Sequence, residues 1–290
     1  MFDMNKILEM WNKEFPALKK YTNRSILINI KPFLIGLRLM KTGMEEEYRV
    51  YFEIYPLWRE KERFYTLVFE ELMSKNGFQI FIRWRAHEEK FSLALESTKA
   101  KYGRLLNRQI NLTDFIYYML IHKKDINSQF TTPDWQIPIF QIFFGLAIYL
   151  DNKSLMDYAK KLLEQEIKRW RKIRIMTQGI YHYETINGKS KKRLVPGSRE
   201  IITYSADQIE EYKNEIFEDF KDRKQFFDRI EENCKRPKIA KLNVGEFVNI
   251  EEFEPPKSFW EKLTSLFKRA ELNIDINTRS GDLLTSDNYE

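Results

Sequence analysis

The sequence predicts an α+β fold, in which an N-terminal antiparallel sheet with flanking helices precedes a mainly helical body with one β-hairpin. Up to about residue 85, apolar residues alternate with other residues in short runs, which is the spacing of strands. Beyond that point they recur mostly at helical spacing. The 290-residue chain has only 10 glycines and 9 prolines, so long helices are expected. The expected division is 1–105 for sheet and helices, 106–254 for the helical body with its hairpin, and 255–290 for a terminal amphipathic helix and frayed tail.

The N-terminal part is expected to form one helix and several strands. The helix is predicted over residues 4–18, where apolar positions have near-helical spacing. Residues 64–73 fit either a strand or a short helix. Asn76-Gly77 is a strong turn signal, and residues 78–85 after it alternate so cleanly that they are expected to be the best strand in the chain. Further strands are predicted over 26–30, 33–39 and 48–58.

The stretch from Asp134 to Ile175 is expected to form a helical hairpin. Its first half is apolar nearly all round, and its second half is amphipathic and ends in positive charge, which predicts one buried limb and one surface limb. Ser154 and Asp157 have capping-box spacing at the start of the second limb. Trp170 lies on the apolar stripe, so we interpret it as a core residue and not as a platform for stacked bases.

Other helices and one β-hairpin complete the predicted body. Asn111 or Thr113 is expected to cap a helix over 114–123, and a polar loop is expected to follow it. Asn187-Gly188 marks the turn of the hairpin, and Ser205 with Gln208 opens a long charged helix to about Asn233. The remaining helices are predicted over 88–102 and 258–272.

The usual motifs of catalysis and metal binding are missing. The three histidines, His87, His122 and His182, are scattered, and Cys234 is the single cysteine, so no zinc-site spacing and no intramolecular disulfide are available. His182 and Glu184 share a face of a predicted strand, which makes them the best polar pair among these residues. No catalytic residue, metal ligand or cofactor site is therefore predicted.

Two further patterns bear on phosphate chemistry. Gly188-Lys189-Ser190 matches the end of a phosphate-binding loop, but Tyr183 occupies the position of its first glycine, and the fragment lies in a hairpin. A metal-dependent nuclease could be sketched only at Glu53 with Glu60, Lys61 and Glu62 beyond it. A solvated turn is the simpler interpretation of that acidic cluster.

A basic cluster is the clearest surface feature. Such cations could neutralise phosphates of a nucleic acid, although cations at a helix C-terminus are also stabilised by the helix dipole. Glu164 and Glu166 dilute the positive field. The cluster consists of Lys168, Arg169, Arg171, Lys172, Arg174, Lys189, Lys191, Lys192 and Arg193.

These observations lead to a hypothesis about function. The net charge of +6 permits an acidic partner without requiring one. The single cysteine and the absence of a signal-peptide pattern favour a cytoplasmic protein, and the longest apolar run is shorter than the roughly 20 residues that span a bilayer. We expect a non-enzymatic interaction protein with an unidentified protein partner, such as an accessory component of a bacterial defence or immunity assembly. Nucleic-acid binding by the basic cluster is the alternative, and a metal-dependent nuclease is less favoured.

Overall fold

A computed structural model describes residues 3–42, 46–60, 66–74, 78–129, 133–171, 173–176, 180–186, 189–195, 199–202 and 204–254. For residues 123–129, 135, 173–176, 180–186, 189–195 and 199–202 it describes the backbone alone. All the helices and strands below belong to one compact unit, Met1–Phe253. The predicted terminal helix over 258–272 lies outside the described residues.

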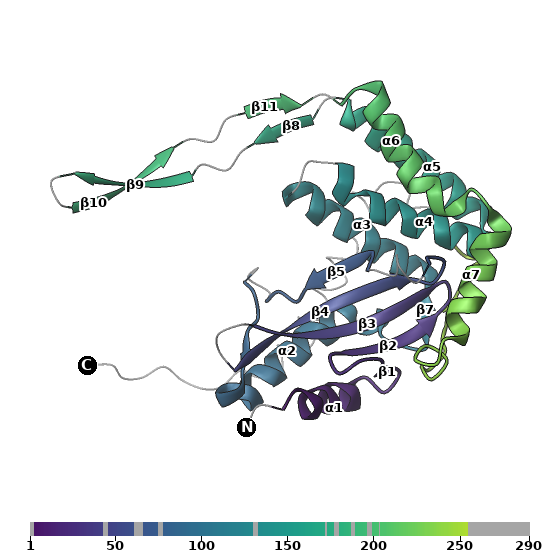
Figure 1. The fold of residues 1–290 in the computed structure, drawn as a ribbon, viewed down its shortest axis with the longest axis horizontal. Helices are drawn as coiled ribbons and strands as arrows, with labels where there is room; N and C mark the ends of the chain where they lie inside the picture. The colour runs from purple at the N-terminus through teal and green to yellow at the C-terminus, as the bar shows by residue number, and fades with distance from the viewer. Residues whose placement is uncertain are drawn as a thin grey trace, which may run out of the picture. The chain divides into compact units, whose positions relative to one another are not determined.

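The N-terminal antiparallel sheet is present, which confirms the α+β prediction (Figure 1). Its order is β1-β2-β3-β4-β5, and β6 also pairs with β4. The strands are β1 (Lys19–Lys20), β2 (Ser25–Ile30), β3 (Phe33–Lys41), β4 (Glu47–Pro56), β5 (Val68–Glu71) and β6 (Ile82–Arg83). The ambiguous segment 64–73 therefore contains a strand.

Helices pack on one face of this sheet. Trp11 donates from Nε1 to the hydroxyl of Tyr48 at 3.1 Å. Phe52 stacks on Tyr102, with 4.6 Å between ring centroids. These contacts bury aromatic rings that alternate along β4, so the strand period places them on the core side. The helices are α1 (Met4–Glu14), α2 (His87–Tyr102) and α3 (Leu112–Gln129).

The predicted helical hairpin is confirmed, with one correction to its cap. Helix α4 (Ile137–Tyr149) is buried on almost every side, and α5 (Lys153–Trp170) buries one stripe that ends at Trp170. The expected capping box of Ser154 is wrong, because Asn152 precedes the helix and its side chain accepts a hydrogen bond from the Leu155 amide at 2.9 Å.

The predicted best strand, 78–85, is mostly wrong. Only Ile82–Arg83 forms a strand, and Gln79 makes a single bridge to Met73. The reason is that β5 already pairs with β4 over Tyr51–Ile54, which leaves only Glu47 and Tyr48 for β6. The segment has the alternation of a strand, but β5 occupies most of the edge of β4 with which it would pair.

Two helix lengths also differ from the prediction. Helix α3 continues to Gln129 through the expected polar loop, and its start is held by Asn111, whose side chain accepts from the Asp114 amide at 3.1 Å. The single helix expected from Ser205 to Asn233 is wrong. Its Ser205–Gln208 capping box is confirmed, but Asp222 starts a new helix by accepting from the Gln225 amide at 2.9 Å. The elements are α6 (Ala206–Phe217), a 3₁₀ turn η5 (Glu218–Phe220) and α7 (Arg223–Lys235).

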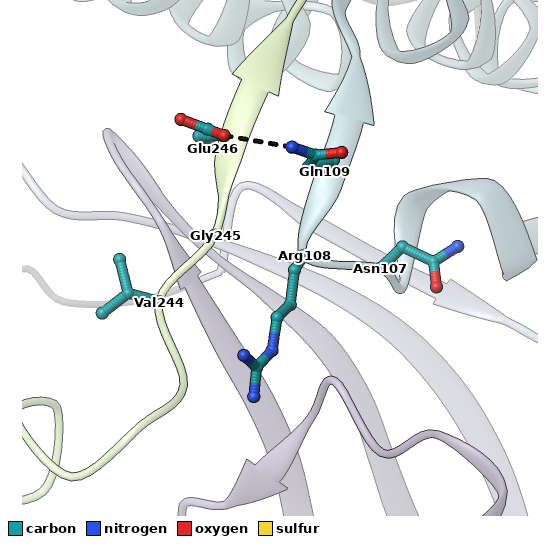
Figure 2. Close-up of a pocket in the computed structure, with 6 residues that line it drawn as sticks. All are labelled: Asn107, Arg108, Gln109, Val244, Gly245 and Glu246. Carbon is teal, nitrogen blue, oxygen red and sulfur yellow. Dashed lines mark hydrogen bonds between the residues drawn. The ribbon is translucent and has the colours of Figure 1, made fainter.

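The remaining strands connect distant parts of the chain. Strand β12 (Glu246–Val248) runs parallel to β7 (Gln109–Asn111), and a Cβ at Gly245 would lie 2.3 Å from the Arg108 carbonyl oxygen, so glycine permits this close approach (Figure 2). The predicted β-hairpin is confirmed as paired strands between α5 and α6. Short 3₁₀ turns are η2 (Trp84–Ala86), η3 (Gly103–Leu105) and η4 (Pro133–Trp135). None of the described helices is long and apolar enough to cross a bilayer.

Candidate binding surfaces

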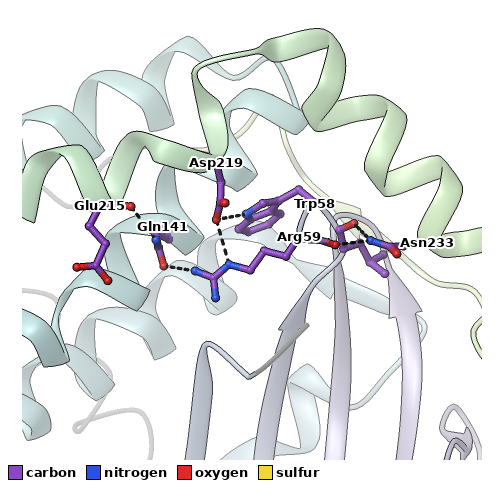
Figure 3. A network of polar contacts seen from close by, with 7 residues as sticks. Trp58, Arg59, Gln141, Glu215, Asp219 and Asn233 are labelled. Atoms are coloured by element: carbon purple, nitrogen blue, oxygen red, sulfur yellow. Dashed lines mark hydrogen bonds and ion pairs between the residues drawn. The ribbon is translucent and has the colours of Figure 1, made fainter. Parts of the chain in front are cut away.

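A buried polar network joins the end of β4 to the helices (Figure 3). The Arg59 guanidinium lies between two partners. Its Nε is 3.0 Å from the Asp219 carboxylate, and its Nη2 donates to the side-chain carbonyl oxygen of Gln141 at 2.7 Å. Trp58 donates from Nε1 to the same carboxylate at 3.2 Å. Asn233 donates to the backbone carbonyl of Arg59 at 2.8 Å. These contacts attach η5 and α7 to the sheet, so the network has a structural role.

Glu53 lies on the face of the sheet opposite the packed helices and is fully buried. Its carboxylate lies 2.8 Å from Nε of Arg38 and accepts a hydrogen bond from the Tyr55 hydroxyl at 3.2 Å. Glu60, the other described member of the acidic cluster, is exposed and pairs instead with Arg229. The other two residues of that cluster lie outside the described residues. Within the described part of the chain, no group of three His, Cys, Asp or Glu side chains could hold a metal ion.

Burial raises the pKa of Glu53, and the nearby Arg38 guanidinium opposes that rise. A carboxyl whose pKa is higher in the folded than in the unfolded state binds more protons when folded, so its contribution to stability falls as pH rises from about 4.5 through the folded pKa. We expect the Glu53→Gln variant to lack this part of the pH dependence. Urea unfolding across this pH range measures it, with the exposed Glu60→Gln variant as control. Parallel profiles for wild type and Glu53→Gln would contradict the expectation.

The structure explains two of the three histidines and leaves the third undecided. His87 lies 3.1 Å from the Tyr48 hydroxyl through Nε2, and burial lowers its pKa, as expected for a neutral core histidine. His122 lies 3.4 Å from a Glu70 oxygen that also accepts from Tyr118. Sequence reasoning missed this cluster, although Tyr118 and His122 are four residues apart and thus on one helix face. Only the backbone of His182 is described.

An aromatic surface covers part of the sheet face opposite the helices. It consists of Arg38, Arg49, Tyr51, Phe69 and Phe81. Tyr51 and Phe69 stack with 4.4 Å between centroids, and Arg38 lies 5.6 Å from the Phe69 ring. Arg49 lies 4.1 Å from the centroid of Phe81. Such cation–π contacts hold arginine side chains against aromatic rings and keep both at the surface.

An apolar groove of 740 Å³ adjoins this surface and shares Phe81 with it. Its most exposed apolar side chains are Phe78, which is 71% exposed, and Leu93, which is 48% exposed. Among the described residues, six large apolar side chains are exposed, and three of them line this groove. Two of the three, Phe78 and Phe81, belong to the segment 78–85 that was predicted to be a strand. Because most of this segment does not pair in the sheet, these apolar side chains remain exposed to solvent.

A second groove of 650 Å³ lies beside β7 and β12 (Figure 2). Four of its six lining residues are polar or charged, and among them Gln109 donates to the Glu246 carboxylate at 3.2 Å. Val244 is its one large exposed apolar residue, at 66% exposure. Val244 therefore provides a reference position for mutations outside the apolar groove.

The predicted basic residues are divided between α5 and two pairs of strands. Lys168 and Arg171 are exposed at the end of α5, and Arg169 lies 3.4 Å from Glu166. Lys172 lies outside the described residues. Arg174 is on strand β8 (Ile173–Met176), and Lys189, Lys191, Lys192 and Arg193 are on β10 (Lys189–Val195).

Burial raises the pKa of the Cys234 thiol, which keeps it in the unreactive neutral form.

Comparison of the chain with protein-family models, with curated proteins and with solved structures finds no match. The surfaces described above are therefore the basis for inferring function.

Proposed function

We propose that this protein has a non-enzymatic role and binds a partner protein through its apolar groove and aromatic surface. The observation that carries this proposal is the concentration of exposed Phe78, Phe81 and Leu93 in one groove. Contiguous exposed apolar groups mark interaction sites on soluble proteins, and burying them against a partner stabilises a complex by roughly 25 cal/mol per Å² before association costs. Aromatic and arginine side chains, both present here, dominate the binding energy of many interfaces.

The charges that line the groove indicate the chemistry of the partner. The Arg83 and Lys90 side chains are 65% and 44% exposed, and each lies 3.5 Å from a carboxylate, Arg83 from Glu47 and Lys90 from Glu89. The Glu47 carboxylate is 11% exposed and accepts a hydrogen bond from Thr42 at 2.6 Å, so little of its charge reaches solvent. The groove thus combines an apolar floor with two exposed cations, each of which also has a carboxylate partner within this chain. It suits an apolar protein segment that carries carboxylates.

We further propose that the partner belongs to a cytoplasmic bacterial assembly of the defence or immunity type. This proposal rests on the single cysteine and on the composition rich in lysine, isoleucine and asparagine. It is separate from the groove proposal, which stands on surface chemistry.

A peptide-display selection against the immobilised full chain tests the groove. We expect selected peptides to combine aromatic or aliphatic residues with Asp or Glu. The Phe78→Glu/Leu93→Glu double variant should weaken their binding at least about tenfold, because it places two carboxylates in the apolar site. The matched control is Val244→Glu, which adds a carboxylate at a similarly exposed apolar position elsewhere.

Two outcomes would overturn the proposal. One is a selection that returns no peptide, and the other is peptide binding that the double variant and Val244→Glu reduce equally. Far-UV circular dichroism and urea unfolding of each variant establish that loss of binding is not loss of fold.

A further inference from the structure

The part of the sequence between α5 and α6 forms two antiparallel strand pairs, labelled β8 to β11 in Figure 1. Strand β8 pairs with β11 (Arg199–Ile202), from Ile173 opposite Ile202 to Met176 opposite Arg199. Strand β9 (Ile180–Ile186) pairs with β10, from Ile180 opposite Val195 to Ile186 opposite Lys189. The second pair is nested within the first. We call these four strands the ribbon.

The positive charge of the whole chain is concentrated in and beside the ribbon. Residues 168–202 contain ten lysines and arginines and two acidic residues, whereas the rest of the chain contains 39 and 41. The remainder of the protein is therefore slightly acidic. Stabilisation by a helix dipole accounts for cations in the last turn of α5, but its effect ends within about one turn and does not reach β10.

The strand register leaves most of these cations without an opposed acidic residue. Lys191 stands opposite Glu184, whereas Lys189, Lys192 and Arg193 stand opposite Ile186, Tyr183 and His182. In the other pair, Glu200 stands opposite Ile175 and Arg174 opposite Ile201. Directly opposed residues are the closest cross-strand neighbours, so one of the six strand cations has an acidic neighbour of this kind. A polyanionic partner would supply negative charges for the cations that have no acidic residue directly opposite.

We propose that the ribbon is a binding arm for double-stranded nucleic acid. The major groove of B-DNA admits a two-stranded ribbon, and a strand of seven residues spans about 23 Å at the usual rise, roughly the rise of seven base pairs. Duplex DNA carries one negative charge per roughly 1.7 Å of its axis, so several phosphates lie within the length of β10 for its four cations to contact. Contacts of this kind are made mainly to phosphates, so binding is expected to depend on salt more than on base sequence.

Fluorescence anisotropy with the full chain and a labelled DNA duplex of mixed sequence tests this proposal. Reversing Lys191, Lys192 and Arg193 to glutamate is expected to weaken binding at least about tenfold. It should also reduce the slope of log affinity against log salt by about 2–3, as expected for the loss of about three phosphate contacts. A milder variant with glutamine at the same positions provides the test if the glutamate variant does not fold.

The matched control reverses Lys224, Lys235 and Lys238, three exposed lysines on and after α7, and gives the same net charge. It should retain most of the affinity, because charges beyond a Debye length of about 10 Å are screened. The proposal is overturned if the duplex does not bind at low salt or if both triple variants lose affinity equally. Binding to phosphatidylserine vesicles without binding to the duplex would also overturn it. Retained duplex binding by Phe78→Glu/Leu93→Glu would separate this arm from the groove.

Discussion

Replacing Arg59 with alanine is expected to reduce the free energy of unfolding by about 3–5 kcal/mol. Arg59 and Asp219 are 4% and 8% exposed, and their ion pair is 3.0 Å long. The variant leaves the Asp219 carboxylate buried without its cation. It also removes the hydrogen bond that Arg59 donates to the Gln141 side chain. Because this network attaches η5 to the sheet, the loss should appear in urea unfolding as a lower midpoint.

The control for this variant is Arg223→Ala, which removes an ion pair to Asp151 at the surface. Both of its side chains are more than half exposed, so the urea midpoint should stay close to that of the wild type. Removing Arg59 and Asp219 together should destabilise less than the two single changes added, because neither charge is then left unpaired. Additive losses, or equal losses in Arg59→Ala and Arg223→Ala, would contradict the structural role of the network.

Phe52→Ala is expected to reduce the free energy of unfolding by about 3–5 kcal/mol as well. Phe52 is fully buried at the centre of the sheet, stacked on Tyr102 at 4.6 Å and edge-on to Tyr118 at 5.3 Å. Truncation leaves a cavity between the sheet and α2 and α3 that these large rings cannot fill. Urea unfolding with an unchanged dependence on denaturant concentration would show a pure loss of stability.

Phe69→Ala is the matched control, since it removes the same side chain from the neighbouring strand β5. Phe69 is 42% exposed and belongs to the aromatic surface, so its loss should cost less than about 1 kcal/mol. The pair of variants separates the two faces of the sheet. If Phe69→Ala were as destabilising as Phe52→Ala, the aromatic surface would be part of the core and unsuited to binding a partner.

Several features that depend on neighbouring residues were predicted correctly, although the expected cap at Ser154 was not. The helical hairpin of α4 and α5 follows from its apolar spacing, and the Ser205–Gln208 capping box from two residues three apart. Burial of Trp170 follows from its place on the apolar stripe. In each case the residues that determine the structure lie within a few turns of one another.

Features that depend on distant residues were not predictable from periodicity. The expected continuous helix breaks between α6 and α7, where the Asp219 carboxylate bonds to Arg59, 160 residues away in the chain, and Asp222 caps the next helix. The segment 78–85 has strand alternation, but its pairing position on β4 is largely taken by β5. Local spacing does not specify which of two distant segments pairs with a given part of a strand.

The candidate sites divide in the same way. The sequence by itself determined the basic composition near the ribbon, the lack of a zinc-site or nucleotide-loop motif, and the hairpin strands on either side of Asn187-Gly188. Only the tertiary structure decided that Phe78, Phe81 and Leu93 share an exposed groove, and that Glu53 is buried beside Arg38. Charge density and hydrophobic periodicity can be read from residues that are close in the sequence. The exposure of a side chain instead depends on which distant elements pack against it in the folded protein.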